Sequence, residues 1–290
     1  MSLTTRQQQH AATLFLLASL AAGTNPAHAA KDSASKQPAA ATLGVDALHA
    51  RARAGDAQAQ YALAERYSNG HDVPMDRTLA FRWYGAAAAQ GLAKAEYALA
   101  RYHNGQVGDR LDPPQALALT TRAAEHGHVP AQTELGFLYF NGSGSAARNL
   151  PLSFRWFKQA AGNGSIPAQC MMGDFYMQGL GGVKQDYASA LKWYKRTAVK
   201  DDRCASKSQF ALHRLYASGK GVAKDMDTAT RWLKKAAEAG NPAAQQALGR
   251  AYQAGDGLPQ DPGLARRWMR KSREGVAPHD DHEHQDEDDH

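Results

Sequence analysis

The sequence has few cysteines and prolines, no long apolar run after its N-terminus and no common catalytic motif, and each of these absences excludes a class of protein. It holds two cysteines and 12 prolines in 290 residues. No run of 18 apolar residues occurs after the first thirty positions, so we expect no transmembrane segment once the N-terminus has been cleaved. The motifs G-x-S-x-G, H-E-x-x-H and C-x-x-C are missing, and no glycine-rich turn continues into Gly-Lys-Ser/Thr. We therefore expect a protein that is not an enzyme and needs no cofactor.

The first 29 residues have the composition and order of a secretory signal peptide. Arg6 supplies a positive start, Ala11–Ala22 is an apolar core, Asn25-Pro26 breaks the helix, and Ala27-His28-Ala29 is an A-x-A cleavage site. Residues 1–29 are therefore expected to direct export and to be removed. This predicts a periplasmic protein in a bacterium or, alternatively, a secreted one. A buried N-terminal helix is the other reading of the same residues.

The net charge of +6 conceals a division along the chain. Residues 279–290 hold seven acids and no lysine or arginine, so residues 30–278 carry a net charge of +12. A basic body in an exported protein favours an anionic envelope polymer as partner and makes nucleic acid unsuitable, although solvated helix surface also accounts for much of the charge. Residues 30–44 are expected to form a flexible linker, and residues 276–290 a disordered His/Asp-rich acidic tail.

A repeat is the dominant feature of the sequence. A tyrosine recurs at intervals of 35 to 40 residues, each followed three positions later by glycine: Tyr67, Tyr102, Tyr139, Tyr176, Tyr216 and Tyr252. A tryptophan, replaced once by leucine, keeps the same interval: Trp83, Leu119, Trp156, Trp193, Trp232 and Trp268. An acid or amide stands seven positions before each of these. Such self-similarity predicts stacked copies of one supersecondary unit.

Each unit predicts two helices. In the fourth unit Ala168, Met172 and Tyr176 form one apolar stripe of a first helix, which ends in a left-handed glycine cap. The acid or amide is the N-cap of a second helix, whose tryptophan we expect in the core. The small residue before the tyrosine, such as Gly173, predicts the close approach of a neighbouring helix. We therefore expect an all-α protein, an α/α superhelical solenoid of six helix-turn-helix repeats. The expected units are a capping helix at 45–54 and six repeats within 55–275, at 55–90, 91–126, 127–163, 164–199, 200–239 and 240–275.

The units resemble the Sel-one-like repeat, a relative of the tetratricopeptide repeat. Its pattern A-x-x-x-L-G-x-x-Y-x-x-G-x-G-V-x-x-D-x-x-x-A-x-x-W-y-x-x-A-A is met most fully by Ala168–Ala198 and Ser208–Ala237. The second unit departs from it, because Leu99 and Tyr102 are three residues apart instead of four. The resemblance implies a non-catalytic protein-interaction scaffold or adaptor, as in envelope signalling or exopolysaccharide control. Cysteine-rich relatives imply the alternative of a weak β-lactamase-like enzyme or binder acting on envelope glycan.

Partner binding is expected on the first helices, which face the concave side of such a solenoid. The candidates are the residues off the apolar stripe, because exposed aromatic and arginine side chains often anchor protein interfaces. They are Tyr61, Glu65, Tyr97, Arg101, Thr133, Phe137, Asp174, Phe210, Arg214 and Arg250.

Cysteines and histidines leave two further alternatives open. Cys170 and Cys204 form either one disulfide, as an oxidising compartment permits, or two semi-buried free thiols. The tail histidines stand among carboxylates and could bind Zn²⁺, Ni²⁺ or Cu²⁺ loosely, which would indicate a metal-handling protein. The composition favours a solubilising acidic tail instead. These histidines are His279, His282, His284 and His290.

Overall fold

The computed structural model describes residues 40, 43–107, 111–200 and 202–274. The predicted signal peptide and acidic tail lie outside these residues, as does most of the predicted linker. The compact unit that carries the helices begins at Val45. Its described part contains thirteen α-helices and no strand. None of them is both long enough and apolar enough to span a membrane.

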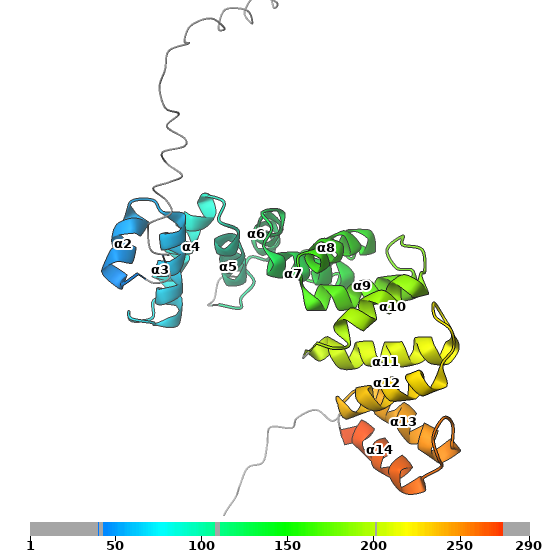
Figure 1. The fold of residues 1–290 in the computed structure, drawn as a ribbon. Coiled ribbons are helices and arrows are strands. Elements are labelled where there is room, and N and C mark those ends of the chain that lie inside the picture. Colours follow the sequence, from blue (N-terminus) through cyan, green and yellow to red (C-terminus); the bar gives the residue numbers. More distant parts are fainter. Residues whose placement is uncertain (1–39, 41–42, 108–110, 201, 275–290) are drawn as a thin grey trace, which may run out of the picture. The chain divides into compact units, whose positions relative to one another are not determined.

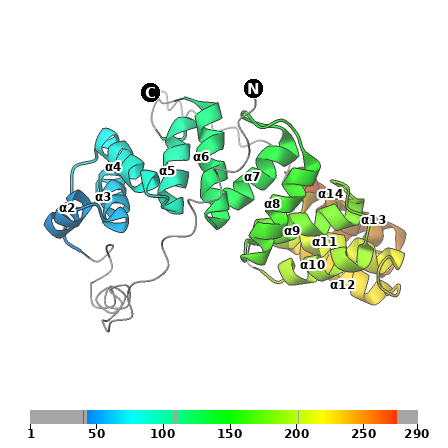
Figure 2. The same cartoon turned by 90° about the horizontal axis from the view of Figure 1, so that it is seen from above.

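The helices form a sequential array. After α2 (Val45–Arg53), six helix pairs follow one another, and each helix contacts the helices before and after it (Figure 1, Figure 2). The all-α helical repeat fold is thereby confirmed. The pairs are α3 (Ala57–Asn69) with α4 (Arg77–Ala89), α5 (Ala93–His103) with α6 (Pro113–Glu125), α7 (Val129–Asn141) with α8 (Leu150–Gly162), α9 (Ile166–Gln178) with α10 (Tyr187–Thr197), α11 (Arg203–Ser218) with α12 (Met226–Glu238), and α13 (Pro242–Ala254) with α14 (Pro262–Glu274).

Capping residues explain where these helices begin and end. Five of the first helices end at a glycine with a φ of 68° to 74°, a left-handed conformation that costs glycine little. The second helices begin at an Asp or Asn whose side chain accepts a hydrogen bond from a backbone N–H of the first turn. Asp76, for example, accepts from the Leu79 N–H at 2.8 Å.

In the second repeat, the prediction that Tyr102 is the landmark tyrosine is wrong. In the other repeats the N-cap residue donates its backbone N–H to the carbonyl of the landmark tyrosine, as Asp186 does to Tyr176 at 2.9 Å. In the second repeat Asp112 donates to the carbonyl of His103 at 2.7 Å. His103 therefore holds the landmark position, and α5 ends at this residue, whereas the other first helices end two residues after their landmark tyrosine. Tyr102 instead holds the position of Phe175 in the fourth repeat, and both side chains are buried.

The two helices of a pair approach closely at one small residue. A Cβ built at Gly136 or Gly173 would lie 2.5 Å from the ring of Phe157 or Tyr194. These rings come from the residue after the tryptophan, and they are 0% and 2% exposed. The expectation that the tryptophans form the core holds only in part, because they pack against the buried clusters but are themselves only partly buried. Adjacent helix positions point about 100° apart, so the residue after each tryptophan faces the first helix.

The sequence analysis missed a buried side-chain amide that recurs near the start of the first helices. The Nε2 of Gln132 donates to the carbonyl of Ala124 in α6 at 3.0 Å, and its Oε1 accepts from Asn163 after α8 at 3.0 Å. Gln60 joins Ala52 and Gln90 in the same way, at 3.0 and 2.8 Å. Gln60 and Gln132 thus each tie three consecutive helices together.

The second repeat replaces this amide with a carboxylate. Glu96 is fully buried, and its two oxygens accept from Arg122 Nη2 at 2.7 Å and pair with His126 Nδ1 at 2.8 Å. Arg122 also donates to the carbonyl of Ala88 at 3.3 Å, at the end of the preceding second helix. An ion pair thus does here what an amide does in the neighbouring repeats.

The close approach predicts opposite effects for two Gly→Ala substitutions. Gly173→Ala should lower the free energy of unfolding by about 1–3 kcal/mol, because the Tyr194 ring must move. Gly85→Ala in α4 meets nothing within 4 Å and should raise it by up to about 1 kcal/mol through helix propensity. Denaturant titration of both variants measures the difference. Equal effects would mean that the helices of a pair are not in contact at Gly173.

The buried amides predict a graded series. Gln132→Ala removes a side chain bonded on both sides and should cost about 2–4 kcal/mol, because a buried carbonyl and the Asn163 amide lose their partners. Gln245→Ala should cost about half as much, since its Oε1 has no partner among the described residues. The unfolding midpoints of the two variants test this order, and the reverse order would contradict the bridging role of Gln132.

Candidate partner-binding surface

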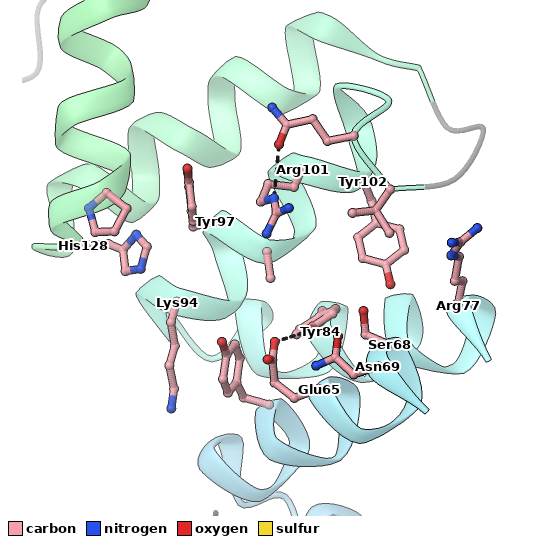
Figure 3. A pocket seen from close by; sticks show the side chains of 15 residues that line it. Glu65, Ser68, Asn69, Arg77, Tyr84, Lys94, Tyr97, Arg101, Tyr102 and His128 are labelled. Atoms are coloured by element: carbon pink, nitrogen blue, oxygen red, sulfur yellow. Dashed lines mark hydrogen bonds between the residues drawn. The ribbon is translucent and has the colours of Figure 1, made fainter. Parts of the chain in front are cut away.

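Four of the predicted partner-binding residues line one pocket. Tyr61 and Glu65 come from α3, and Tyr97 and Arg101 come from the next first helix, α5 (Figure 3). The pocket has a volume of about 510 Å³. Tyr84 of α4 also lines it, because the residue after the tryptophan points toward the first helix.

Hydrogen bonds in this first pocket centre on Glu65. The Tyr84 hydroxyl donates to its carboxylate (Figure 3). Tyr61 also hydrogen-bonds this carboxylate. Burial, reinforced by Glu65, raises the pKa of Tyr61 to about 12 and that of Tyr84 further. Both phenols therefore stay protonated at neutral pH and act as hydrogen-bond donors. The Lys94 ammonium lies 4.2 Å from the centre of the Tyr61 ring.

Tyr97 forms the side of the pocket toward the third repeat. Its ring lies 4.7 Å from that of His128, the N-cap of α7. Burial raises the pKa of Tyr97, as does its hydrogen bond to Glu134. Burial also lowers the pKa of His128, so that imidazole is neutral at pH 7. Arg101 is exposed, and its Nε donates to Gln106 at 3.1 Å.

Three more of the predicted residues line a second pocket of about 570 Å³. Asp174 comes from α9, and Phe210 and Arg214 come from α11. Asp174 is 7% exposed, accepts from the Tyr194 hydroxyl at 2.7 Å and forms an ion pair with Lys207. Burial alone would lower the pKa of Lys207, but the Asp174 carboxylate outweighs burial and raises it.

The two pockets are built from equivalent repeat positions. Glu65 and Asp174 both precede the landmark tyrosine by two residues, and Tyr84 and Tyr194 both follow a landmark tryptophan. Counting from Leu99 and Leu212, the next repeat supplies three further equivalent pairs. These pairs are Lys94 with Lys207, Tyr97 with Phe210, and Arg101 with Arg214. The same five positions of two consecutive repeats therefore make a pocket twice.

The remaining three predicted residues lie outside both pockets. The Thr133 hydroxyl donates to the carbonyl of Val129 at 3.0 Å and shares a hydrogen bond of 2.8 Å with the Ser165 hydroxyl, so it contributes to the joint between repeats. Phe137 packs edge-to-face on Phe157, with ring centres 4.9 Å apart. Arg250 is exposed on α13.

Sequence reasoning missed the pocket residues Tyr84, Tyr194, Lys94 and Lys207. The aromatic residue after the tryptophan was the available signal for the first two. The lysines precede the apolar stripe, and no spacing rule marked them. Among the described residues, no group of three His, Cys, Asp or Glu side chains could hold a metal ion.

The two cysteines lie beside the second pocket. Both are free thiols in this structure, so the disulfide alternative is not formed in it. The thiols hydrogen-bond each other, which holds the pKa of Cys170 below its usual value and raises that of Cys204. Cys170 Sγ also lies 3.7 Å from Ser208 Oγ. Because the two thiols are adjacent, we still predict that they can form a reversible disulfide between α9 and α11.

A thiol–disulfide oxidant should therefore join the two cysteines within one chain. Treatment with oxidised glutathione should remove both thiols from alkylation and raise the free energy of unfolding by about 3–4 kcal/mol, the value for a loop of this length. Mass spectrometry without reductant detects the link, and Cys204→Ser is the control. Mixed glutathione adducts alone, or links between chains, would show that the thiols cannot meet.

Comparison with known proteins agrees with this architecture. The sequence profile of the Sel1 repeat matches the chain six times, at residues 57–92, 93–128, 129–165, 166–200, 206–241 and 242–275. All six of these units begin two to six residues after the predicted ones. Comparison with curated proteins finds no match.

Two solved structures are similar along most of the chain. One is a protective antigen of uropathogenic Escherichia coli strains that displays an SLR fold, with 34% identity and a TM-score of 0.68 over 80% of this chain. This chain covers 49% of that protein's length. The other is a Sel1 repeat protein from Oxalobacter formigenes, with 28% identity and a TM-score of 0.62, which covers 83% of this chain and 100% of its own. Since the Sel1 profile matches well over half of the chain, including all or most of every helix from α3 to α14, the chain belongs to the Sel1 repeat family.

Proposed function

We propose that this chain is a non-catalytic scaffold or adaptor that binds a protein partner on its first helices. Sel1 repeat proteins generally mediate protein–protein interaction. The observation that carries the proposal for this chain is the pair of equivalent pockets. Each has a half-buried aromatic ring, Tyr97 or Phe210, beside an exposed arginine, Arg101 or Arg214. Aromatic and arginine side chains anchor many protein interfaces.

The chemistry of the pockets favours binding over catalysis. The buried tyrosines Tyr84 and Tyr194 have raised pKa values, so neither is an activated nucleophile or a base at neutral pH. Each donates instead to a carboxylate of the same repeat, Glu65 or Asp174. These contacts fix the side chains in place, as a preformed binding surface requires.

The proposed site of action is the bacterial periplasm. This part of the proposal rests on the order of the first 29 residues, which is that of a signal peptide. A role in envelope signalling or exopolysaccharide control fits that location.

An anionic envelope polymer is a second candidate partner, favoured by the charge of the second helices. Across their described residues, the second helices carry sixteen lysines and arginines and four acids. In α12 and α14 the cations Lys235 and Lys271 lie 5.1 Å from the ring centres of Trp232 and Trp268. Such a face attracts polyanions independently of the pockets.

The protein-binding proposal predicts a loss confined to the first helices. The double variant Arg101→Ala/Arg214→Ala should weaken partner binding by about ten-fold or more, because both arginines are exposed and line the pockets. Its melting temperature should be unchanged, since both side chains are exposed. The partner is first captured from a periplasmic extract by cross-linking, identified as one stoichiometric protein, and then titrated against each variant.

The matched control is Arg155→Ala/Arg267→Ala, which removes the same charge from exposed positions of second helices. This control should keep protein binding and lose retention of an anionic polysaccharide. If both double variants bound the captured protein equally, the first helices would not be its binding surface.

A further inference from the structure

The second repeat places a hydroxyl where the other repeats have none. Tyr102 occupies the register position of Leu138, Phe175 and Leu215, as its place one residue before His103 shows. It is 3% exposed and lines the first pocket, where Figure 3 shows its hydroxyl directed toward the side of Tyr84 and Ser68. That hydroxyl has no hydrogen-bond partner among the described residues. Phenylalanine would fill the same space without burying a polar atom.

The positive charge of the first pocket is not balanced by its own carboxylate. Glu65 already accepts a hydrogen bond from Tyr84 and hydrogen-bonds Tyr61. Its carboxylate also attracts the Lys94 ammonium. Among the described residues, Arg101 donates only to a neutral amide, that of Gln106. Arg77 also lines the pocket, and within the described chain no ion pair reaches it. The pocket therefore holds two arginines more than its single acid can neutralise.

The second pocket, built from equivalent positions, lacks the unpartnered hydroxyl of the first. There Asp174 is paired with Lys207 and accepts from Tyr194, and the position of Tyr102 is taken by Leu215, which is fully buried. The two pockets therefore share a neutralised carboxylate and an exposed arginine. Only the first adds a buried hydroxyl to a lining that also contains that arginine. A donor without a partner among the described residues, in the same pocket as an unneutralised cation, fits an oxygen anion.

We propose that the first pocket binds a carboxylate group of the partner, held by the Arg101 guanidinium and the Tyr102 hydroxyl. The aromatic walls formed by Tyr61, Tyr84 and Tyr97 take the apolar part of the same residue. This inference rests on the proposed function, because it names the chemical group that one pocket of the binding surface recognises. A peptide C-terminus and an acidic side chain share this chemistry.

The test uses small probes with the full-length protein, so it needs no partner. The probes are N-acetyl-Gly-Phe with a free C-terminal carboxylate, the same peptide as its amide, and an N-acetyl-Asp-Phe amide that carries only a side-chain carboxylate. NMR shifts of backbone amides in α3 and α5 report binding. At least one acid should bind there saturably and the neutral amide should not; which acid binds tells the C-terminus from the side chain. Equal binding of acids and neutral amide overturns the proposal.

Two tyrosine variants separate binding from stability. Tyr102→Phe should lower the affinity for the acid by about ten-fold, the usual loss for one hydrogen bond to a charged group, without lowering the unfolding midpoint. Tyr194→Phe removes an equally buried hydroxyl that donates to Asp174, so it should lower the midpoint and leave probe binding in the first pocket unchanged. If Tyr102→Phe leaves the affinity unchanged, the hydroxyl does not bind the carboxylate and the proposal is wrong.

Arginine variants complete the test. Arg101→Gln should abolish the preference for acid over amide, whereas Arg250→Gln, on an exposed first-helix arginine outside both pockets, should not change it. A preference that survives Arg101→Gln also overturns the proposal. If the probes fail while Arg101→Ala/Arg214→Ala still weakens the captured protein, this inference falls and the scaffold function stands. If the probes bind and no partner depends on the first helices, the scaffold function falls alone.

Discussion

The array depends on the hydrogen bond from a buried side-chain amide to the end of the preceding second helix. Helices of about a dozen residues are marginal alone, and a single pair cannot bury its apolar face. Apolar contacts hold neighbouring repeats together but do not fix their register. A backbone carbonyl in the last turn of a helix needs a hydrogen-bond donor at one position, and this does fix the register. Gln132 supplies that donor to Ala124 and receives one from Asn163, so its position fixes both neighbours. Where no donor follows, as at Gln209 and Gln245, the amide oxygen is left without a partner among the described residues.

The same geometry places the pockets. Once register is fixed, the residue after the tryptophan reaches the small residue of the first helix, and its hydroxyl meets the carboxylate one position further along. The next first helix then contributes a lysine, an aromatic ring and an arginine. A pocket therefore arises between any two repeats whose sequences carry those residue types. Repeats one and two, and repeats four and five, do so. In the third repeat Phe157 replaces the tyrosine and has no hydroxyl to offer a carboxylate.

Much of the fold could be predicted because repetition averages out local ambiguity. A single glycine or tryptophan indicates little, but the same residue in six aligned units indicates a cap or a contact. The prediction failed where one repeat departs from the average. Tyr102 was aligned with the other tyrosines by residue type, and only the hydrogen bond from Asp112 to His103 shows the true register. The tryptophans misled for a related reason: large aromatic side chains suggest a core, and only helix geometry shows that the next residue points inward. The site residues were partly predictable because they lie off the apolar stripe, yet that rule cannot separate Arg101, in a pocket, from Arg250, on open surface.

The misaligned tyrosine also shows how function can be read from a repeat. In a stacked array the same position occurs once in each repeat, in a similar packing environment. The residue types found there in the other repeats therefore indicate which residues packing alone favours. At the position of Tyr102 three of them have Leu138, Phe175 and Leu215, which fill space and need no partner. A buried hydroxyl without a hydrogen bond costs about 1–3 kcal/mol, and the fold recovers none of it. A local departure that stability does not explain is expected at a functional site. Because Tyr102 and Arg101 line the same pocket, a carboxylate bound in that pocket would supply the hydrogen-bond acceptor that the hydroxyl lacks among the described residues.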